Sequence, residues 1–335
     1  MKPKSIFLTG GAGYCGSLLT PQLLNLGYHV TVYDTLYFGK NFLPLEHPHL
    51  RVIEGDIRDI QKLKANILDA DTFISLACIS NDASFELNEK LSTSVNLNAF
   101  EPMVRAAKEN GIQRFIYASS SSVYGVSDVA DVTEDHPLVP VTLYNKYKGM
   151  CEPVLNSHGD DNFTVTSFRP ATVCGYAPRL RLDLSVNILT NHAITHSEIK
   201  VFGGMQMRPN LHIQDYCDAI KLLIKAPRKT IHQNVFNVGF QNMTIKDLAI
   251  VVKKVVLEEF PEKNKIDIVT THSDDIRSYH INSQKIYNTL GFRPKHTIED
   301  AVRSLCAAFK EGKVQDSMEN DNYYNIRTMQ KLDLG

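Results

Sequence analysis

The chain has 335 residues, of which 43% are hydrophobic and 22% charged, and its formal net charge is −1. This length allows one large domain or two smaller ones, and the composition is that of an ordinary globular protein. The near-zero charge gives no reason to expect a nucleic acid or a membrane surface as partner.

Short β-rich runs alternate with helical stretches in the first half of the chain. The sequence predicts strands over 5–8, 29–33, 50–54, 73–77, 114–118 and 163–168, and helices over 16–26 and 141–155. Strands that alternate with helices form parallel sheets with right-handed crossovers. The predicted fold class is therefore α/β, a doubly wound (Rossmann) parallel sheet.

Beyond about Arg169 this rhythm is interrupted by prolines and by the glycine pair Gly203-Gly204. We expect helices over 215–225, 245–259, 284–290 and 298–310, and strands over 235–238 and 266–269. Residues 1–168 are predicted to bind the dinucleotide. Residues 169–335 are predicted to form a smaller mixed α/β substrate domain, with some strands and helices exchanged between the two. The polar tail 315–335 is expected to be ordered only by packing.

No run approaches the roughly 18 apolar residues of a membrane span, and a strand begins so close to Met1 that a signal peptide does not fit. The six cysteines are scattered without a CxxC pair, as in a cytoplasmic protein with reduced thiols. His192 and His196 lie four residues apart without a third ligand, which favours a solvated helix face, and we predict no metal site.

A glycine-spaced turn, Thr9–Gly16, follows the first predicted strand. Gly10, Gly13 and Gly16 have the G-x-x-G-x-x-G spacing, with Tyr14 and Cys15 between them. Such glycines permit a tight turn and let backbone N–H groups approach a pyrophosphate at the start of a helix. Taken alone, the spacing also suits a purely structural turn.

Two acidic residues at strand ends strengthen the dinucleotide interpretation. Asp34 ends the second predicted strand, where a carboxylate accepts from the adenosine ribose hydroxyls and repels a 2′-phosphate, so NAD is favoured over NADP. Asp56 follows the third strand and could accept from the adenine amino group, with Ile57 beside the ring. The alternatives are a solvated acid at Asp34 and a simple turn acid at Asp56.

Tyr144 and Lys148 lie four residues apart, hence on one face of a helix. A nearby ammonium group stabilises a phenolate and lowers the tyrosine pKa toward working pH. Any helix can contain this pair by chance, but here it follows Ser120 by 24 residues (144 − 120), one helix after the fifth strand. Tyr147 lacks a matching lysine and is expected to be a packing residue.

These motifs together resemble the extended short-chain dehydrogenases/reductases, in the nucleotide-sugar epimerase/dehydratase family. The matching segments are Thr9–Gly16, Gly55-Asp56, Ser119–Gly125, Tyr144–Lys148, Arg169–Thr172 and Arg208–Asp215. The resemblance implies that Ser120 hydrogen-bonds the sugar 4-hydroxyl, that Tyr144 removes its proton, and that Lys148 binds the nicotinamide ribose. It also implies cofactor contacts from Leu76, Ala77, Pro170 and Thr172. Asn96 matches a structural asparagine of the family, or else is a helix-surface amide.

Two departures from the family pattern narrow the chemistry. Sugar 4,6-dehydratases of this family carry Asp and Glu after the Ser or Thr, whereas this chain has Ser121 and Ser122. Hydroxyls cannot supply that acid–base work near neutral pH, so dehydration is disfavoured. Ser122 also stands where C3/C5 epimerases of GDP-sugars carry Cys, which disfavours that route. Ser75 stands at a position where this family usually carries a histidine, so the imidazole contact is missing in this chain.

Arginines gather in the second half, and guanidinium groups suit a diphosphate. The resemblance implies that Arg208 and Arg277 clamp the diphosphate of the substrate, that Phe202 stacks on its base and that Asn187 donates to a phosphate. Arg179 and Arg181, in a run not general to the family, are candidates for reaching substituents of an unusual sugar. The alternative is surface ion pairs with Asp183 or Asp274.

We therefore predict an NAD-dependent enzyme of carbohydrate or polysaccharide biosynthesis that oxidises C4 of a nucleotide-activated sugar through a 4-keto intermediate. Net 4-epimerisation is favoured. The alternatives are a nucleotide-sugar 4-dehydrogenase or 4-ketoreductase and, less favoured, a non-catalytic NAD-binding sensor. The resemblance also implies a homodimer formed through helices near 96–110 and 144–155. The nucleotide, the sugar and the pathway stay open.

Overall fold

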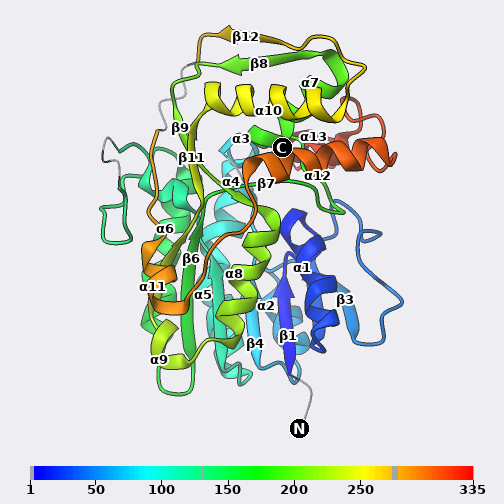
Figure 1. Ribbon diagram of the computed structural model, residues 1–335. Helices are drawn as coiled ribbons and strands as arrows, with labels where there is room; N and C mark the ends of the chain where they lie inside the picture. Colours follow the sequence, from blue (N-terminus) through cyan, green and yellow to red (C-terminus); the bar gives the residue numbers. More distant parts are fainter. Residues whose placement is uncertain (1–3, 81, 128, 130, 274–277, 335) are drawn as a thin grey trace.

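Parallel strands form the central sheet of the computed structural model, which describes residues 4–80, 82–127, 129, 131–273 and 278–334 (Figure 1). Within these residues the sheet has seven strands, in the order β10-β6-β5-β4-β1-β2-β3. The strands are β10 (Asn234–Val238), β6 (Thr164–Pro170), β5 (Arg114–Ala118), β4 (Thr72–Ser75), β1 (Ser5–Thr9), β2 (His29–Asp34) and β3 (Leu50–Glu54). Every neighbouring pair is parallel. The predicted doubly wound fold is confirmed.

Alternate residues of each strand point to opposite faces, so each face of the sheet has its own core. Ile6 and Leu8 pack under α1 (Tyr14–Asn25) and α8 (Ile213–Lys225). Phe7, paired in register with Phe73 on β4, points to the other face, and their rings lie 5.2 Å apart. That face is covered by α2 (Ile60–Asn66), α5 (Phe100–Glu109) and α6 (Leu143–His158).

The upper part of the molecule in Figure 1 is built by the second half of the chain. Helices α7 (Ser185–His196), α10 (Ile245–Glu259) and α12 (Ile298–Lys310) pack with β8 (Glu198–Phe202) around a separate core. Two small sheets complete it: β8 beside β12 (Asp267–Thr271), and β9 (Met207–His212) between β7 (Thr172–Cys174) and β11 (Gln241–Thr244). Strand β10 also belongs to the second half but joins the central sheet. The division at residue 168 stays a prediction.

Several elements differ from the predicted ones. Helix α6 begins at Leu143, because Thr142 caps it by accepting from the Asn145 N–H, and it ends at His158 rather than at 155. The stretch between β4 and β5 contains short helices that no long periodic pattern marks: α3 (Asp82–Leu87), α4 (Glu89–Thr93) and the π-helix η1 (Ser94–Asn98). The other elements are η2 (Ser121–Tyr124), α9 (Arg228–Ile231), α11 (Gln284–Leu290), η3 (Asp321–Tyr323) and α13 (Asn325–Lys331).

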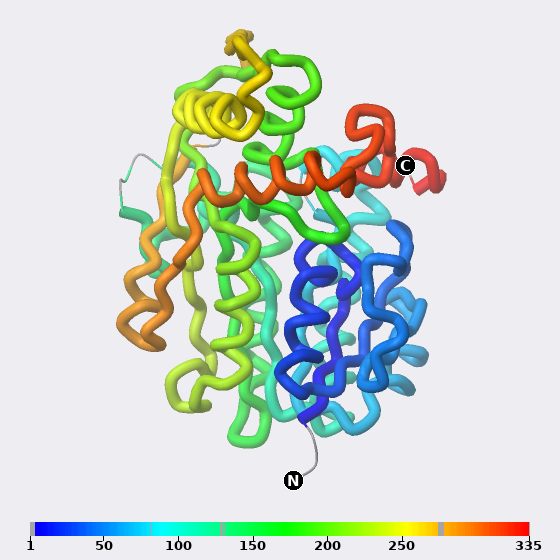
Figure 2. Tube along the Cα trace, turned by 45° about the vertical axis from the view of Figure 1, so that its right-hand side comes forward, coloured from blue at the N-terminus to red at the C-terminus, as the bar shows by residue number. Residues whose placement is uncertain are grey.

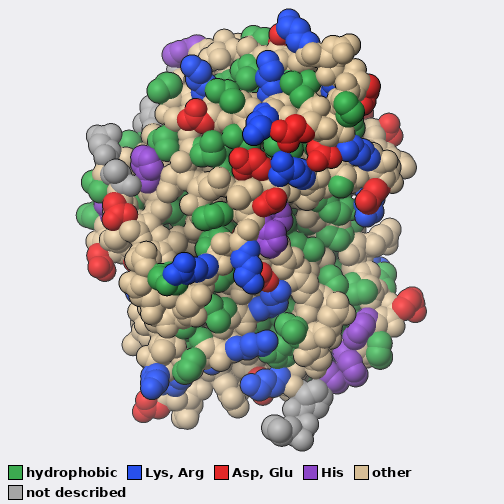
Figure 3. All heavy atoms as spheres, in the orientation of Figure 1, with side chains coloured by type: hydrophobic (Ala, Val, Ile, Leu, Met, Phe, Trp, Pro, Cys, Tyr) green, Lys and Arg blue, Asp and Glu red, His purple; other side chains and the backbone are tan. Residues whose placement is uncertain are grey.

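The C-terminal segment crosses back over the molecule, where α13 packs against α3 (Figure 2). The expectation that the polar tail is ordered by packing therefore holds for its described part. Positive and negative side chains alternate over the face that carries α10 and α12 (Figure 3), with ion pairs from Arg303 and Lys310 to Glu258 and Glu259. In the described part of the chain no helix has the length and apolar character to cross a membrane.

Candidate active site

A cavity of about 630 Å³ lies at the carboxyl ends of the central strands, at the point where the strand order reverses between β1 and β4. Its lining includes Gly10, Leu76 and Ser119, each the residue directly after a strand of the sheet. Ligands of open α/β sheets bind at this switch point, and a cavity of this size suits an organic ligand or cofactor.

The glycine turn forms the cavity wall at the start of α1. Gly10 has φ +76°, and a Cβ there would come within 2.6 Å of the Ala77 nitrogen. A Cβ on Gly16 would lie 2.4 Å from the Gly10 carbonyl oxygen. Gly13 is the N-cap of α1 and has no side chain to cover the helix start. Backbone and helix dipole are thus presented to the cavity, which fits a dinucleotide pyrophosphate.

All fourteen residues predicted to contact the cofactor line this cavity. The Asp34 carboxylate accepts from the N–H groups of Ala12 and Leu36, which lower its pKa, but burial has the larger effect and raises it. Asp56 forms an ion pair with Arg58 at 2.6 Å. Partial burial raises the pKa of Asp56, and the bonds from Arg58 outweigh it, so that the pKa is lowered.

The three predicted catalytic residues come together in the cavity from η2 and α6. Tyr144 and Ser120 both line the cavity, and Ser120 acts to lower the Tyr144 pKa. The Lys148 ammonium donates to the Ala118 carbonyl at 2.8 Å and lies 6.0 Å from the centre of the Tyr144 ring. Burial raises the pKa of Tyr144, aided by Cys78, and Arg181 and Ser120 act in the opposite direction. In the protein alone, the net shift of the Tyr144 pKa is therefore upward, unlike the lowering expected beside Lys148.

Ser121 and Ser122, which follow Ser120, also line the cavity. The Ser122 hydroxyl donates to the Asn145 side-chain oxygen at 2.5 Å and lies 2.7 Å from the Ser120 hydroxyl. Tyr147 packs its ring on Phe85, as expected of a packing residue. Asn96 is buried and bonds both the N–H and the carbonyl of Ile79, so it holds the loop after β4 rather than lying on a helix surface.

The residues predicted to bind the substrate have mixed outcomes. Phe202, Arg208, Arg179 and Arg181 line the cavity. Asn187 does not: it is fully buried, and its amide donates to the Tyr14 hydroxyl and to the Arg181 carbonyl in place of the predicted phosphate. Side-chain hydrogen bonds of this kind are what a buried amide requires. Arg277, predicted to bind the substrate diphosphate, lies outside the described residues.

Sequence reasoning missed several lining residues: Phe38, Cys78, Ser80, Tyr279 and Asn325. Phe38 lies in an irregular loop, and Asn325 lies in the C-terminal tail, so neither belongs to a periodic pattern or a motif. Cys78 and Ser80 follow closely after the end of β4, and this position could have marked them as candidates for the cavity wall. For Asn325 only the tertiary fold brings the residue to the cavity. Within the described residues, no group of three or more acidic, His or Cys side chains could hold a metal ion.

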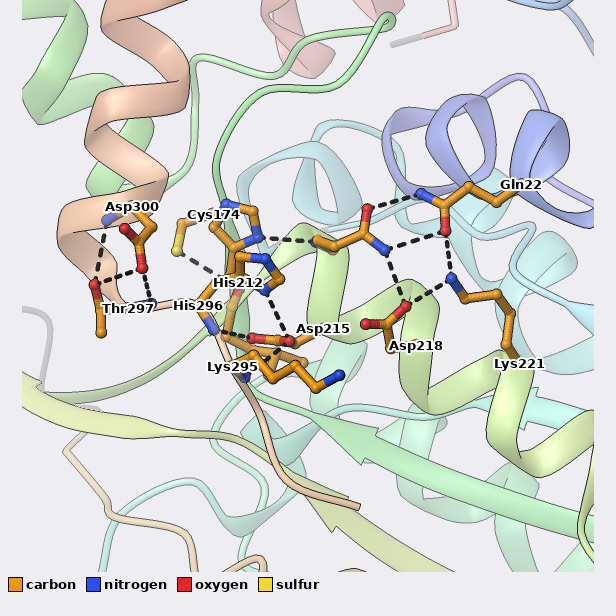
Figure 4. Close-up of polar contacts among 12 residues, drawn as sticks. Gln22, Cys174, His212, Asp215, Asp218, Lys221, Lys295, His296, Thr297 and Asp300 are labelled. Carbon is orange, nitrogen blue, oxygen red and sulfur yellow. Dashed lines mark hydrogen bonds and ion pairs between the residues drawn. The ribbon is translucent and has the colours of Figure 1, made fainter. Parts of the chain in front are cut away.

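The segment Arg208–Asp215 serves in part to fix the corner between β9 and α8 (Figure 4). Asp215 is buried and accepts from the backbone N–H groups of Lys295 and His296 and from the His296 ring. His212 is the N-cap of α8, and its ring accepts from the Gln214 N–H at 3.0 Å. This network ties the segment before α12 to the start of α8, the helix that packs on the central sheet.

The half-buried ring of His212 predicts a pH-dependent stability. Burial, with the stacked His296 ring, lowers the His212 pKa to about 4, whereas an unfolded histidine titrates near about 6.5. Between these values the unfolded chain binds more protons, so stability falls as the pH falls from about 6.5 toward 4. His212→Asn keeps a capping acceptor and removes the titration. Thermal unfolding at pH 7 and pH 5 should show a smaller drop in Tm for this variant. An equal drop would contradict the assignment.

Comparison with known proteins identifies the family of this chain. The model of the NAD-dependent epimerase/dehydratase family matches residues 6–239, which include the glycine turn, Ser120, Tyr144 and Lys148. The chain belongs to this family. This confirms the family resemblance that the motifs indicated. The predicted enzyme class and the NAD cofactor are confirmed as well.

Relatives with different net reactions resemble the chain to a similar degree. UDP-arabinose 4-epimerase 1 of Arabidopsis thaliana is 28% identical, with 87% of this chain and 76% of the relative covered. A UDP-glucose 4-epimerase of Thermotoga maritima with UDP-glucose superposes with a TM-score of 0.82 at 22% identity, over 92% of this chain and 99% of its own. A dTDP-glucose 4,6-dehydratase of Streptomyces venezuelae with NAD bound gives 0.81 at 22%, over 92% and 98%. The family is thus shown, and the substrate and net reaction are not.

Proposed function

We propose that this enzyme oxidises C4 of a nucleotide-activated sugar to a 4-keto intermediate and reduces it again from the opposite face, giving net 4-epimerisation. The observation that supports this most strongly is the cluster of Ser120, Tyr144 and Lys148 inside one cavity with the glycine turn. The hydroxyls at Ser121 and Ser122 stand where dehydration would need carboxyl groups.

Each side chain has a part in this proposal that its position allows. Ser120 lines the cavity beside Tyr144, so its hydroxyl can hydrogen-bond the sugar 4-hydroxyl and align the proton for transfer to the phenolic oxygen. Lys148 is buried and fixed on the Ala118 carbonyl, so its positive charge stays near Tyr144. NAD, when bound, supplies the hydride acceptor. On the return step Tyr144 gives its proton back to the new C4 oxygen.

The other parts of the molecule receive roles consistent with this proposal. Residues 1–168 supply most of the contacts to NAD, and residues from 169–335 bind the nucleotide sugar, with Arg208 on its diphosphate and Phe202 on its base. Arg208 and Phe202 line the cavity together with Lys200 and Gln206 from the same β8–β9 region, which suits an anionic nucleotide end.

All six cysteines are free thiols, which supports a reducing compartment such as the cytoplasm.

Incubation with a panel of UDP-, dTDP-, GDP- and CDP-sugars, with the products resolved chromatographically, tests the proposed reaction. We expect one substrate to give its C4 epimer at equilibrium without consuming added NAD. Release of a keto sugar with no C4 epimer would instead favour the 4-dehydrogenase or 4-ketoreductase. A 6-deoxy-4-keto product would show that the serines at 121 and 122 do not prevent dehydration.

We also propose a homodimer in which α5 and α6 of each subunit form a four-helix contact. These two helices pack side by side, and α6 exposes Met150 on its outer surface. Single exposed apolar side chains are common on protein surfaces, so the proposal rests on the family resemblance and Met150 serves as the probe. Light scattering should give twice the 37.7 kDa chain mass, and Met150→Lys should shift the molecule toward the monomer. A wild-type monomer would remove the proposal.

A further inference from the structure

Two buried arginines, Arg179 and Arg181, line the same cavity as the residues predicted to bind NAD. Arg179 is 2% exposed and Arg181 is 7% exposed, yet both line the cavity. Guanidinium groups are almost never buried this far unless their donors are satisfied and their charge is balanced. If the protein itself supplies too few acceptors or too little negative charge for these two groups, a bound anion is expected to supply the rest.

The protein satisfies these guanidinium groups only in part. Arg179 donates through Nη2 to the Asn325 side-chain oxygen at 2.6 Å, and its guanidinium carbon lies over the Phe38 ring, 3.6 Å from the ring centre. Arg181 bonds the carboxylate of Asp183 at 2.9 Å and the Ser80 hydroxyl at 3.0 Å. Arg179 Nε and Arg181 Nη2 are buried without a hydrogen-bond acceptor in the described structure. Burial and the neighbouring Arg181 lower the pKa of Arg179 to about 9, as expected of a cation that lacks enough negative charge.

The two arginines also mark out a length of the cavity. Arg179 interacts electrostatically with Asp34 and Tyr14, and Arg181 with Cys15 and Tyr144. Asp34 is at the end predicted for the adenosine ribose, and Tyr144 is beside the nicotinamide end. The segment between these ends is the glycine turn and the uncapped start of α1. In a bound dinucleotide, the pyrophosphate occupies this middle position.

We propose that Arg179 and Arg181 bind the pyrophosphate of NAD from the side opposite the glycine turn. The diphosphate then lies between backbone N–H groups and two guanidinium groups, and its negative charge balances their positive charge. This assignment replaces the sugar contacts predicted for these residues from the sequence. It rests on the NAD-binding part of the proposed function and does not depend on the net reaction.

Asn325 acts as a positioning residue in this arrangement. Besides holding Arg179, it donates through its side chain to the Ser80 hydroxyl at 3.0 Å and through its backbone to Asp183 at 3.0 Å. Ser80 and Asp183 are the two partners of Arg181. One residue of the C-terminal helix α13 thus connects both arginines, and the C-terminal segment helps to close the cofactor site.

Calorimetric titration of NAD-free protein with NAD⁺, ADP-ribose and adenosine tests the proposal without any sugar. ADP-ribose keeps the pyrophosphate, and adenosine lacks it. Arg179→Met and Arg181→Met should each weaken NAD⁺ and ADP-ribose binding roughly 10- to 100-fold, the usual effect of losing a charge-assisted hydrogen bond. Adenosine binding should change little. Asn325→Ala should cause a smaller loss with the same selectivity for ligands that carry the pyrophosphate.

Arg303→Met, on the exposed face of α12, is the matched control and should change none of these affinities. The Tm of NAD-free Arg179→Met should equal or exceed that of the wild type, because an incompletely paired buried cation has been removed. A lower Tm with equal losses for adenosine and ADP-ribose would show a structural role and overturn the proposal. Unchanged NAD⁺ affinity with weaker binding of UDP or dTDP would overturn it too, and would assign the pair to the substrate diphosphate. A failure of 4-epimerisation alone would leave these results intact.

Discussion

Tyr144→Phe is expected to reduce turnover of the accepted nucleotide sugar by about 10²- to 10⁴-fold, the usual range for loss of a general acid–base group. The substitution removes one hydroxyl and keeps the ring, which packs beside Phe85 on the wall of the cavity. NAD affinity should stay within about threefold of the wild type, because Lys148 and the glycine turn are untouched. Single-turnover rates and equilibrium binding of NAD measure the two effects separately.

Tyr147→Phe is the matched control on the same helix. Its ring also packs on Phe85, but it does not line the cavity, so turnover should be nearly unchanged. Full activity of Tyr144→Phe would mean that another group takes the proton. Loss of activity in both variants would point to a packing effect of α6 rather than to chemistry. Unchanged biological activity of Tyr144→Phe with NAD still bound would favour the non-catalytic sensor.

Glu152→Ala is expected to destabilise the fold by about 3–5 kcal/mol, because it leaves a buried arginine without its counter-charge. The Glu152 and Arg169 side chains are 4% and 6% exposed and form two hydrogen bonds, at 2.6 and 2.9 Å. Burial acts to lower the pKa of Arg169, and Glu152 more than reverses this. The pair joins α6, which carries Tyr144 and Lys148, to strand β6. Urea unfolding of the two proteins gives the difference in free energy.

An exposed pair provides the comparison for this experiment. Glu258 contacts Arg303 on the surface at 3.3 Å, and Glu258→Ala should cost no more than about 1 kcal/mol. Glu152→Gln keeps the shape of the side chain and should have an intermediate effect. If Glu152→Ala were as stable as Glu258→Ala, the buried pair would not be what holds α6 against the sheet.

The fold could be predicted well from the sequence where local pattern and tertiary position agree. The strands of the first half are short, apolar and bounded by turns, so their period and order identify the doubly wound sheet. The glycine turn was equally readable, because Gly10 and Gly16 occupy positions where any side chain would strike the backbone. Tyr144 and Lys148 share a helix face by spacing alone.

What could not be predicted depends on contacts between segments far apart in the chain. Asn325 reaches the cavity only because α13 packs back on α3, and no periodicity marks that return. Asn187 lies in α7, and the fold uses its amide to hold Tyr14 and Arg181 instead of a ligand. Glu152 gives no signal in the sequence that sets it apart from a solvated acid on α6, although it is buried against Arg169.

In the proposed reaction, C4 of the sugar loses a hydride and regains the same one. A nucleotide sugar deuterated at C4, chosen from the substrate accepted in the panel, tests it most directly by mass spectrometry and NMR of the product. We expect a C4 epimer that keeps its deuterium at C4 and takes none up from solvent. A C4 epimer that has lost the label, or a keto sugar as the final product, would contradict it.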